Sequence, residues 1–257
     1  MNWRKIVKIS IITATYNSEQ TLKDTLESVL NQTYQDYEHI IIDGKSKDNT
    51  MKIVKEYEER YNGRLKYISE KDTGLYDAMN KGIKMATGDV IGILNSDDKY
   101  ANENVLQIIA DKFKETNCDG TYANLIFMDE ETMTKPKRIW KSPCGKLEDG
   151  WHPAHPTLYL KREVYDKIGL FNLKYRIVAD YDFMIRMLKD KTIKLEYIDE
   201  YIVYMRIGGT STAGMKGYIK NLKEAHQTLK ENKVKHPILV DIKRILKTIR
   251  QMKTKSI

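Results

Sequence analysis

Short apolar runs alternate with amphipathic segments through the first hundred residues, and this alternation limits the fold more than any other feature. The runs are rich in β-branched residues, and the segments after them carry apolar side chains at helical spacing. Repeats of this kind predict right-handed crossovers and a mainly parallel sheet flanked by helices, an α/β architecture. The predicted strands are 6–13, 37–43, 65–69 and 89–94; the predicted helices are 18–30, one that opens at Ser46 or Asp48, and 75–86.

Polar residues collect where these strands end. Thr13 and Asn17 follow the first strand, Asp43 ends the second, and Asn95-Ser96-Asp97-Asp98 follow the fourth. The carboxyl ends of parallel strands share one edge of a sheet, where ligands bind. One polar ligand site across this edge is therefore the simplest interpretation, and separate helix caps are the alternative.

The acidic group 95–98 is an unusual way to end a buried strand, because carboxylates are rarely buried unless they are paired or bind a cation. Oxygen ligands beside a diphosphate suit Mg²⁺ or Mn²⁺. The alternative is a cap for a helix predicted over 102–115. Neither a P-loop nor a G-x-G-x-x-G sequence is present. A bound nucleotide diphosphate would therefore be neutralised by a cation at Asp97.

Composition supports a soluble globular chain. Its 257 residues are 41% hydrophobic and 31% charged, and no apolar run approaches the roughly 20 residues that span a bilayer. Cys118 and Cys144 form no metal-type spacing, which fits a reduced, cytoplasmic protein. We expect one large domain over 1–212, with a nucleotide-binding half of about 1–100 and an acceptor half of about 101–212, followed by an extension over 213–257.

Four segments in register resemble glycosyltransferase family 2, in particular its bacterial enzymes of O-antigen, capsule and exopolysaccharide synthesis. They are Ile9 to Asn17, Ile42 to Thr50, Gly74 to Gly82, and Ala86 to Asp89 running into Asn95 to Asp98. The resemblance implies a GT-A fold, a Rossmann-like α/β domain that uses a nucleotide sugar and Mn²⁺ or Mg²⁺. The family's D-x-D falls on Asn95-Ser96-Asp97, so Asp97 would be the metal ligand. Asn95 departs from the pattern, although its amide can still hydrogen-bond a ribose.

The same resemblance assigns the donor site. Thr13, Thr15 and Asn17 would line the nucleoside pocket. Asp43 would accept from the base, typically uracil. Lys45, Ser46 and Asp72 would lie near the donor, together with Asn95 and Ser96.

In the second half, Asp180 is the predicted general base. It lies near the start of a predicted helix, where the family has a Glu-Asp pair and this chain has Ala179-Asp180. An inverting sugar transfer needs a carboxylate that takes the proton of the acceptor hydroxyl. Asp182 would be its neighbour or an acceptor contact. The alternative is that both acids favour a helix N-terminus.

Two further positions are candidates for acceptor or phosphate contacts. His155 follows His152 in a proline-bracketed stretch, and no additional Cys or His accompanies the pair, which argues against zinc. A structural histidine pair is the alternative. Arg206 precedes Gly208-Gly209 and could reach the diphosphate when that loop closes; an ordinary turn explains it equally well.

The C-terminal segment is basic. Residues 216–257 hold twelve Lys/Arg and three Asp/Glu, so the rest of the chain is close to neutral. Helices are predicted over 216–232 and 237–252, the second with an apolar stripe of Ile238, Ile242, Ile245, Ile249 and Met252. Such a helix either packs on the domain or lies on an anionic membrane.

The sequence thus predicts an inverting, metal-dependent transferase. It would move a hexose or N-acetylhexosamine from a UDP-sugar to a saccharide acceptor that a polyprenyl diphosphate carries. The enzyme would be peripheral on the inner face of the cell membrane, and its oligomeric state stays open. A sugar nucleotidyltransferase and a non-catalytic basic module that binds membrane or nucleic acid are the rivals; no nucleic-acid-binding motif is present.

Overall fold

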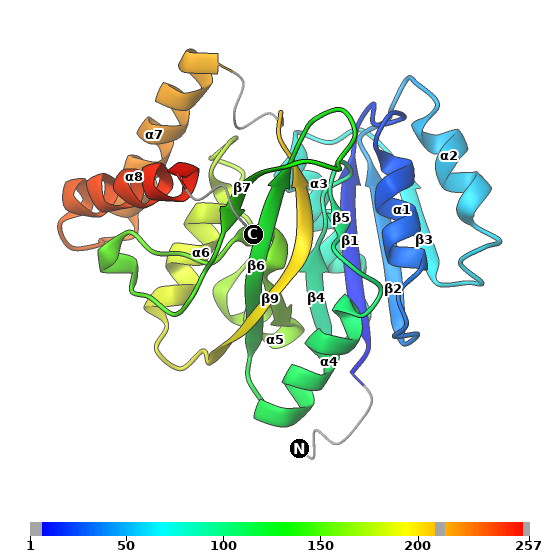
Figure 1. The fold of residues 1–257 in the computed structure, drawn as a ribbon, viewed down its shortest axis with the longest axis horizontal. Coiled ribbons are helices and arrows are strands. Elements are labelled where there is room, and N and C mark those ends of the chain that lie inside the picture. The colour runs from blue at the N-terminus through cyan, green and yellow to red at the C-terminus, as the bar shows by residue number, and fades with distance from the viewer. Residues whose placement is uncertain (1–6, 209–213, 254–257) are drawn as a thin grey trace.

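The computed structural model describes residues 7–208 and 214–253. Figure 1 shows a single twisted sheet with helices on both of its faces. The first half contains β1 (Ile9–Thr15), α1 (Leu22–Leu30), β2 (Tyr37–Asp43), α2 (Thr50–Tyr57), β3 (Leu65–Ser69), α3 (Leu75–Met85) and β4 (Val90–Ile93). The second half contains β5 (Lys99–Tyr100), α4 (Val105–Thr116), β6 (Gly120–Met128), β7 (Pro136–Trp140), the 3₁₀ turns η1 (Leu147–Asp149) and η2 (His155–Thr157), β8 (Tyr159–Lys161), α5 (Arg162–Ile168), α6 (Ala179–Lys189), β9 (Leu195–Arg206), α7 (Gly214–Glu231) and α8 (Pro237–Lys253).

The strands form one sheet in the order β3-β2-β1-β4-β8-β6-β9-β5, with β7 paired to β6. β3, β2, β1 and β4 run parallel, as the sequence predicts. β8 runs antiparallel to both β4 and β6, whereas β6 and β9 are parallel again. The first and second halves of the chain are therefore joined through β4 and β8 within one sheet.

The apolar runs are continuous because the central strands are buried on both faces. Successive residues of β1 point to opposite sides: Ile9 and Ile11 belong to the core that includes side chains of α1, α2 and α4. Ile12 and Ala14 belong to the core that includes side chains of α3, α5 and α6. Each fully buried isoleucine contributes on the order of 2 kcal/mol. This packing holds the carboxyl ends of the strands in a fixed arrangement.

The C-terminal helices continue this core. Ala225 and Leu229 of α7 are fully buried in the same cluster as the apolar side chains of α6. Glu224 of α7 accepts a hydrogen bond from the backbone N–H of Ile177 at 3.1 Å. Packing against the domain, one of the two alternatives for this segment, therefore describes α7.

Several boundaries differ from the prediction. β1 begins at Ile9 and continues to Thr15; Ile6 lies outside the described residues. α1 begins at Leu22, because residues 18–21 form a turn in which the carbonyl of Ser18 accepts from the N–H groups of Thr21 and Leu22. Within the described ranges, no helix combines the length and apolar character that crossing a bilayer requires.

Candidate active site

The loop after β4 carries two acids in different surroundings. Asp98 is buried, and its oxygens accept from the backbone N–H of Arg206 (3.0 Å) and from Asn95 Nδ2 (2.8 Å). Asp97 is half-buried, and no ion pair to it occurs within residues 7–208 and 214–253. Burial raises the pKa of Asp97, and its own backbone N–H and the charge of Arg206 offset only part of that rise. Asp98 is thus structural, whereas Asp97 is an uncompensated acid.

The same loop is tied to the loop after β1. Ser96 Oγ lies 3.0 Å from Ser18 Oγ, and the carbonyl of Ser96 accepts from Thr21 Oγ1 at 2.9 Å. The predicted donor contacts Asn95 and Ser96 therefore use their side chains for protein contacts, which fix the backbone on which Asp97 stands.

The two predicted threonines of β1 differ. Thr13 Oγ1 donates to the carbonyl of Leu94 at 2.8 Å and lies 2.9 Å from His39 Nε2, so its hydroxyl supports the end of β4 from inside the core. Burial lowers the pKa of His39 to about 3, which keeps that ring neutral. Thr15 is buried as well, but its hydroxyl has no hydrogen-bond partner in the described part of the chain. Of the two, Thr15 is the one whose buried hydroxyl is unpaired among the described residues.

Hydrogen bonds connect the loop after β1 to the loop after β2. Asp43 accepts from the hydroxyls of Ser46 and Ser69, each at 2.5 Å. The backbone N–H of Asn17 donates to Ser46 Oγ at 2.8 Å, and Asn17 Oδ1 accepts from the N–H of Lys47 at 2.9 Å. Asn17 and the exposed Lys45 both adopt positive φ, 50° and 66°. Asp43, Ser46 and Asn17 are therefore brought together at the sheet edge as predicted.

Gly44 lies between two further side chains of this edge. A Cβ atom at Gly44 would lie 2.6 Å from Asp72 Oδ2 and 3.3 Å from the ring of Tyr16. Tyr16 is 57% exposed, which is unusual for an aromatic side chain packed beside an acid. The Asp72 carboxylate and the Tyr16 ring thus both contact the backbone that follows Asp43.

If the predicted UDP donor binds at this edge, we expect Gly44→Ala to weaken its binding by about tenfold, the equivalent of about 1.4 kcal/mol, because the added methyl group displaces Asp72 and Tyr16. Titration calorimetry with UDP measures this. Gly217→Ala in α7 is the matched control, since a Cβ there meets nothing within 4 Å. Equal affinities for the Gly44 variant and the control would show that this contact does not shape the nucleotide pocket.

Asp180 is held by a residue of the first half. It lies in the first turn of α6, and its Oδ1 accepts from the hydroxyl of Tyr76 at 2.9 Å. The same hydroxyl lies 2.8 Å from the carbonyl of Ile177. Tyr76 is in the first turn of α3, which begins at the carboxyl edge of the sheet after β3. Asp180 therefore lies at the edge that carries Asp43 and Asp72.

Asp182 is not available to an acceptor. It is 3% exposed, and its two oxygens accept from Arg186 Nε (2.9 Å) and from Asn232 Nδ2 (2.8 Å). Residues 180 and 182 are about 200° apart around a helix, so they point to opposite sides. The suggestion of an acceptor contact is replaced by a structural role that joins α6 to the end of α7.

His155 lies near the predicted base. The charge of Asp180 acts on both His152 and His155, but burial is the larger effect; it lowers the pKa of His155 and lowers that of His152 to about 4. Both rings are therefore neutral at pH 7. His155 packs edge-on against Phe171 at 5.6 Å, and His152 packs against Trp140 and Tyr181.

Arg206 contacts the acidic loop directly. Its Nε donates to the carbonyl of Asp97 at 3.3 Å, its Nη1 to the carbonyl of Glu130, and its Nη2 contacts Asp24 Oδ2 at 3.4 Å. The chain beyond it is described only to Gly208, so the predicted closing loop from Gly209 onward lies outside the described residues. Arg206 thus places a cation beside Asp97.

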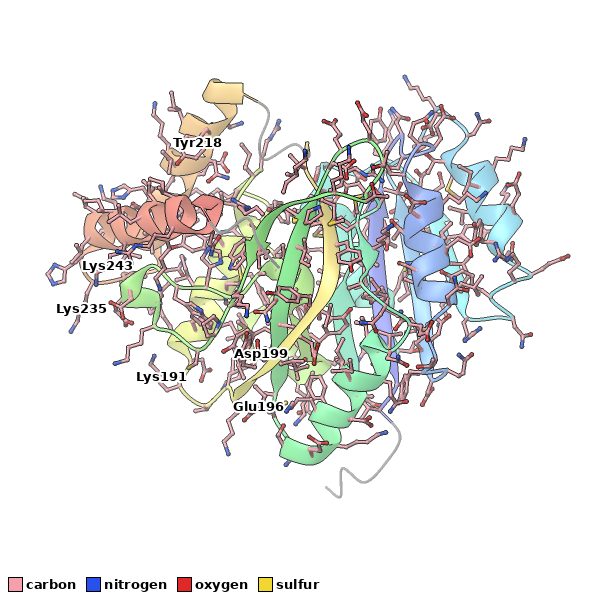
Figure 2. The ribbon with its side chains drawn as sticks, in the orientation of Figure 1. Lys191, Glu196, Asp199, Tyr218, Lys235 and Lys243 are labelled. Atoms are coloured by element: carbon pink, nitrogen blue, oxygen red, sulfur yellow. The ribbon has the colours of Figure 1, made fainter. Side chains whose placement is uncertain are left out.

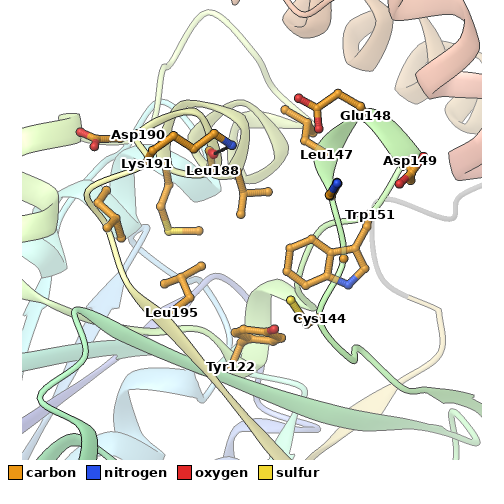
Figure 3. Close-up of a pocket in the computed structure, with 14 residues that line it drawn as sticks. Tyr122, Cys144, Leu147, Glu148, Asp149, Trp151, Leu188, Asp190, Lys191 and Leu195 are labelled. Atoms are coloured by element: carbon orange, nitrogen blue, oxygen red, sulfur yellow. Dashed lines mark hydrogen bonds between the residues drawn. The ribbon is translucent and has the colours of Figure 1, made fainter.

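A cavity of about 720 Å³ lies away from all of these residues. It is bounded by Tyr122, Trp151 and apolar residues near the C-terminal end of α6, the end opposite to Asp180. Figure 3 shows Tyr122 and Leu195 on one side of it and Lys191 and Asp190 on another. None of the predicted site residues lines it.

Two aromatic residues at the edge were not assigned roles from the sequence. Tyr76 and Tyr16 both occur in the family-like segments, but their contacts are with Asp180 and with Gly44 and Asp72. The signal in the sequence was their place in these segments: Tyr16 stands between Thr15 and Asn17, and Tyr76 directly precedes Asp77. The partner of Tyr76 is 104 residues away, which spacing along the chain cannot reveal.

Comparisons with known proteins agree on one family. The sequence profile described as Glycosyl transferase family 2 matches residues 10–191. A "PGL/p-HBAD biosynthesis glycosyltransferase" of Mycobacterium bovis (strain BCG / Pasteur 1173P2) is 30% identical over 218 residues, which cover 83% of each chain.

Solved structures show the same fold. S. aureus TarS 1–349 in complex with UDP-GlcNAc matches with a TM-score of 0.67 and 20% identity, over 86% of this chain and 66% of that one. The chain spans 39% of the length of a longer TarS chain. The mannosyltransferase PcManGT from Pyrobaculum calidifontis, in complex with GDP-Man and Mn²⁺, matches with a TM-score of 0.67 and 14% identity, over 100% of this chain and 78% of that one. These likenesses establish the GT-A fold.

Proposed function

Because the chain belongs to glycosyl transferase family 2 and is therefore a glycosyltransferase, we propose that it is inverting and metal-dependent. It would move a hexose or N-acetylhexosamine from a UDP-sugar to a sugar hydroxyl of a cell-surface polysaccharide precursor. The main support is that one sheet edge carries both an uncompensated acid, Asp97, and a second acid, Asp180, bound by Tyr76. Family membership argues against the nucleotidyltransferase and the non-catalytic module.

Asp97 fits a hard divalent cation, since its carboxylate forms no ion pair within residues 7–208 and 214–253 and the charge of Arg206 offsets only part of the cost of its burial. No group of three or more His, Cys, Asp or Glu in the described ranges could form a metal site alone, so Asp97 would share Mn²⁺ or Mg²⁺ with the diphosphate of the donor. When bound, the cation would stabilise the charge of the leaving diphosphate. PcManGT was solved in complex with GDP-Man and Mn²⁺, which supports the use of a divalent cation.

Asp180 is the proposed base. Tyr76 binds Oδ1, which leaves Oδ2 for the hydroxyl of the acceptor. Asp180 would take that proton as the acceptor oxygen bonds to the anomeric carbon and the bond from that carbon to the phosphate oxygen breaks, with the electron pair leaving on UDP. A single displacement of this kind inverts the anomeric configuration. Arg206, beside Asp97, and Thr15, with its free hydroxyl, are the proposed contacts to phosphate and nucleoside.

The donor class is supported by TarS, which was solved with UDP-GlcNAc. For the acceptor we propose a saccharide on a polyprenyl diphosphate, of the O-antigen, capsule or exopolysaccharide kind. The enzyme would then work as a peripheral protein on the inner face of the membrane. The basic charge of residues 216–257 supports that location.

A panel of UDP-glucose, UDP-galactose, UDP-GlcNAc, UDP-GalNAc and GDP-mannose tests the proposal. We expect UDP release from one or two UDP-sugars with Mn²⁺ or Mg²⁺, and a loss of about a hundredfold with EDTA. If EDTA leaves the rate of UDP release unchanged, the mechanism does not use a metal ion. If the product retains the anomeric configuration of the donor, the proposed single-displacement mechanism is wrong.

A further inference from the structure

Helix α8 is fixed to the domain along one side. Val240 is 1% exposed, and Lys243 Nζ lies 2.8 Å from Asp149 Oδ1. Gly150, at φ 68°, allows the α8 backbone to approach so closely that a Cβ there would lie 2.4 Å from the N atom of Arg244. This close packing determines which side of α8 faces away from the protein.

The opposite side of α8 is apolar and uncovered. Its large aliphatic side chains are 46–66% exposed and recur at the spacing of one helical face: Ile238, Leu239, Ile242, Leu246 and Ile249. Exposed Tyr218 and Ile219 of α7 add to the apolar surface of the two C-terminal helices. An apolar surface of this extent on a soluble protein marks an interaction site. The side chain of Met252, the last member of the predicted stripe, lies outside the described residues.

Positive charge accompanies this face. α8 contains five Lys/Arg residues and one acid, Asp241, which lies on the side that contacts His226 of α7. Lys235, exposed just before the helix, and Arg250, exposed beside Ile249, border the apolar face. Lys243, Arg244 and Lys247 lie on the side of α8 that packs on the domain. Figure 2 shows Lys235 and Lys243 at the outer edge of the molecule, with Tyr218 farther along the same side.

We propose that the outward face of α8 lies on the surface of an anionic phospholipid bilayer, with its aliphatic side chains at the level of the headgroups. Apolar residues flanked by Lys and Arg on a fixed helix have the pattern of an interfacial helix. A second copy of the chain fits less well, because a two-fold contact through α8 would place like charges opposite each other. The inference rests on the proposed function in one respect: a lipid-linked acceptor would lie at the membrane surface to which α8 binds.

The face has a fixed relation to the active site. α7 connects α8 to α6, and Glu224 of α7 binds the backbone of Ile177, three residues before Asp180. Docking through α8 would therefore hold the proposed base at a constant height above the bilayer, which suits an acceptor anchored in it.

Flotation of the full chain with vesicles tests the proposal. We expect binding to vesicles with about 30% phosphatidylglycerol and little binding to pure phosphatidylcholine. Ile242→Asn with Leu246→Asn should weaken binding at least about tenfold. Lys235→Gln should weaken it about fivefold, and added salt should reduce binding of the unmodified chain. The matched controls are Leu173→Asn, which is 48% exposed but off α8, and Lys52→Gln on α2; both should bind like the unmodified chain.

UDP release without vesicles, measured in parallel, separates the two proposals. If the α8 variants release UDP as the unmodified chain does but no longer float with the anionic vesicles, docking through this face is supported. Equal flotation of the double variant and the unmodified chain overturns it, whatever the transferase activity. If the unmodified chain binds no vesicles but self-associates, and the same variants abolish that self-association, the proposal is overturned in favour of a dimer.

Discussion

Replacing Asp97 with asparagine is expected to lower turnover on the order of 10³-fold while leaving thermal stability unchanged or slightly higher. The loss follows because the amide cannot hold a divalent cation as a carboxylate does. The gain follows because burial raises the pKa of Asp97. A raised folded pKa means that ionisation disfavours the folded state, so metal-free stability falls as pH rises from 3.8 through the folded pKa. Asparagine removes that cost.

Calorimetric melting at pH 7, with and without Mn²⁺, checks this prediction. Mn²⁺ should raise the melting temperature of the unmodified chain and have no effect on Asp97→Asn. Asp98→Ala is the matched control: it leaves the N–H of Arg206 and the amide of Asn95 without their partner and should cost about 1–3 kcal/mol of stability. Full turnover in Asp97→Asn would contradict the role of Asp97. So would an equal rise of the melting temperature with Mn²⁺ in Asp97→Asn and in the unmodified chain.

Asp180→Asn is expected to lower turnover by about 10²- to 10⁴-fold with UDP affinity within about twofold of the unmodified chain. Asparagine keeps the hydrogen bond from Tyr76 and the fold of α6, but it cannot accept the proton of the acceptor. Rapid-quench transfer assays and UDP titration separate the two effects. Normal transfer by this variant would place the base elsewhere.

Two tyrosines refine that test. Tyr76→Phe removes the hydroxyl that positions Asp180 and should reduce turnover by about tenfold. Tyr181→Phe is the control, because its buried hydroxyl has no hydrogen-bond partner among the described residues and its loss should leave turnover unchanged. Equal activities of the two variants would show that the Tyr76 contact is not needed to orient Asp180.

The strands that the sequence predicts well have clear ends in the sequence. β2 and β3 begin and end at the predicted residues, because their apolar runs are bounded by polar residues or glycine. β5 was not predicted as a strand, since its two residues form one only by pairing with β9, where Lys99 lies opposite Tyr204. Gly92 illustrates the limit: its missing side chain makes room for the ring of Tyr159, which no local pattern indicates.

The site shows the same division. The roles proposed for Asp97 and Asp180 follow from the family resemblance and from their places after a strand and at a helix start. The sequence does not reveal which carboxylates already have hydrogen-bond or ion-pair partners, because those partners lie far away along the chain. Glu38 makes the contrast clear: burial would raise its pKa, but hydrogen bonds from Lys66, Ser10 and Thr87 lower it to about 2. Among the residues that the structure describes, Asp97 has no such donors beyond its own backbone.

The packing of α7 on α6 bears on how this enzyme can be shortened. A chain cut after residue 212, where composition changes, would leave one oxygen of Asp182 without Asn232 and the backbone N–H of Ile177 without Glu224. The segment that leads into Asp180 would lose its support. The smallest active version therefore retains the first of the two C-terminal helices, and trimming for crystallisation belongs in the second.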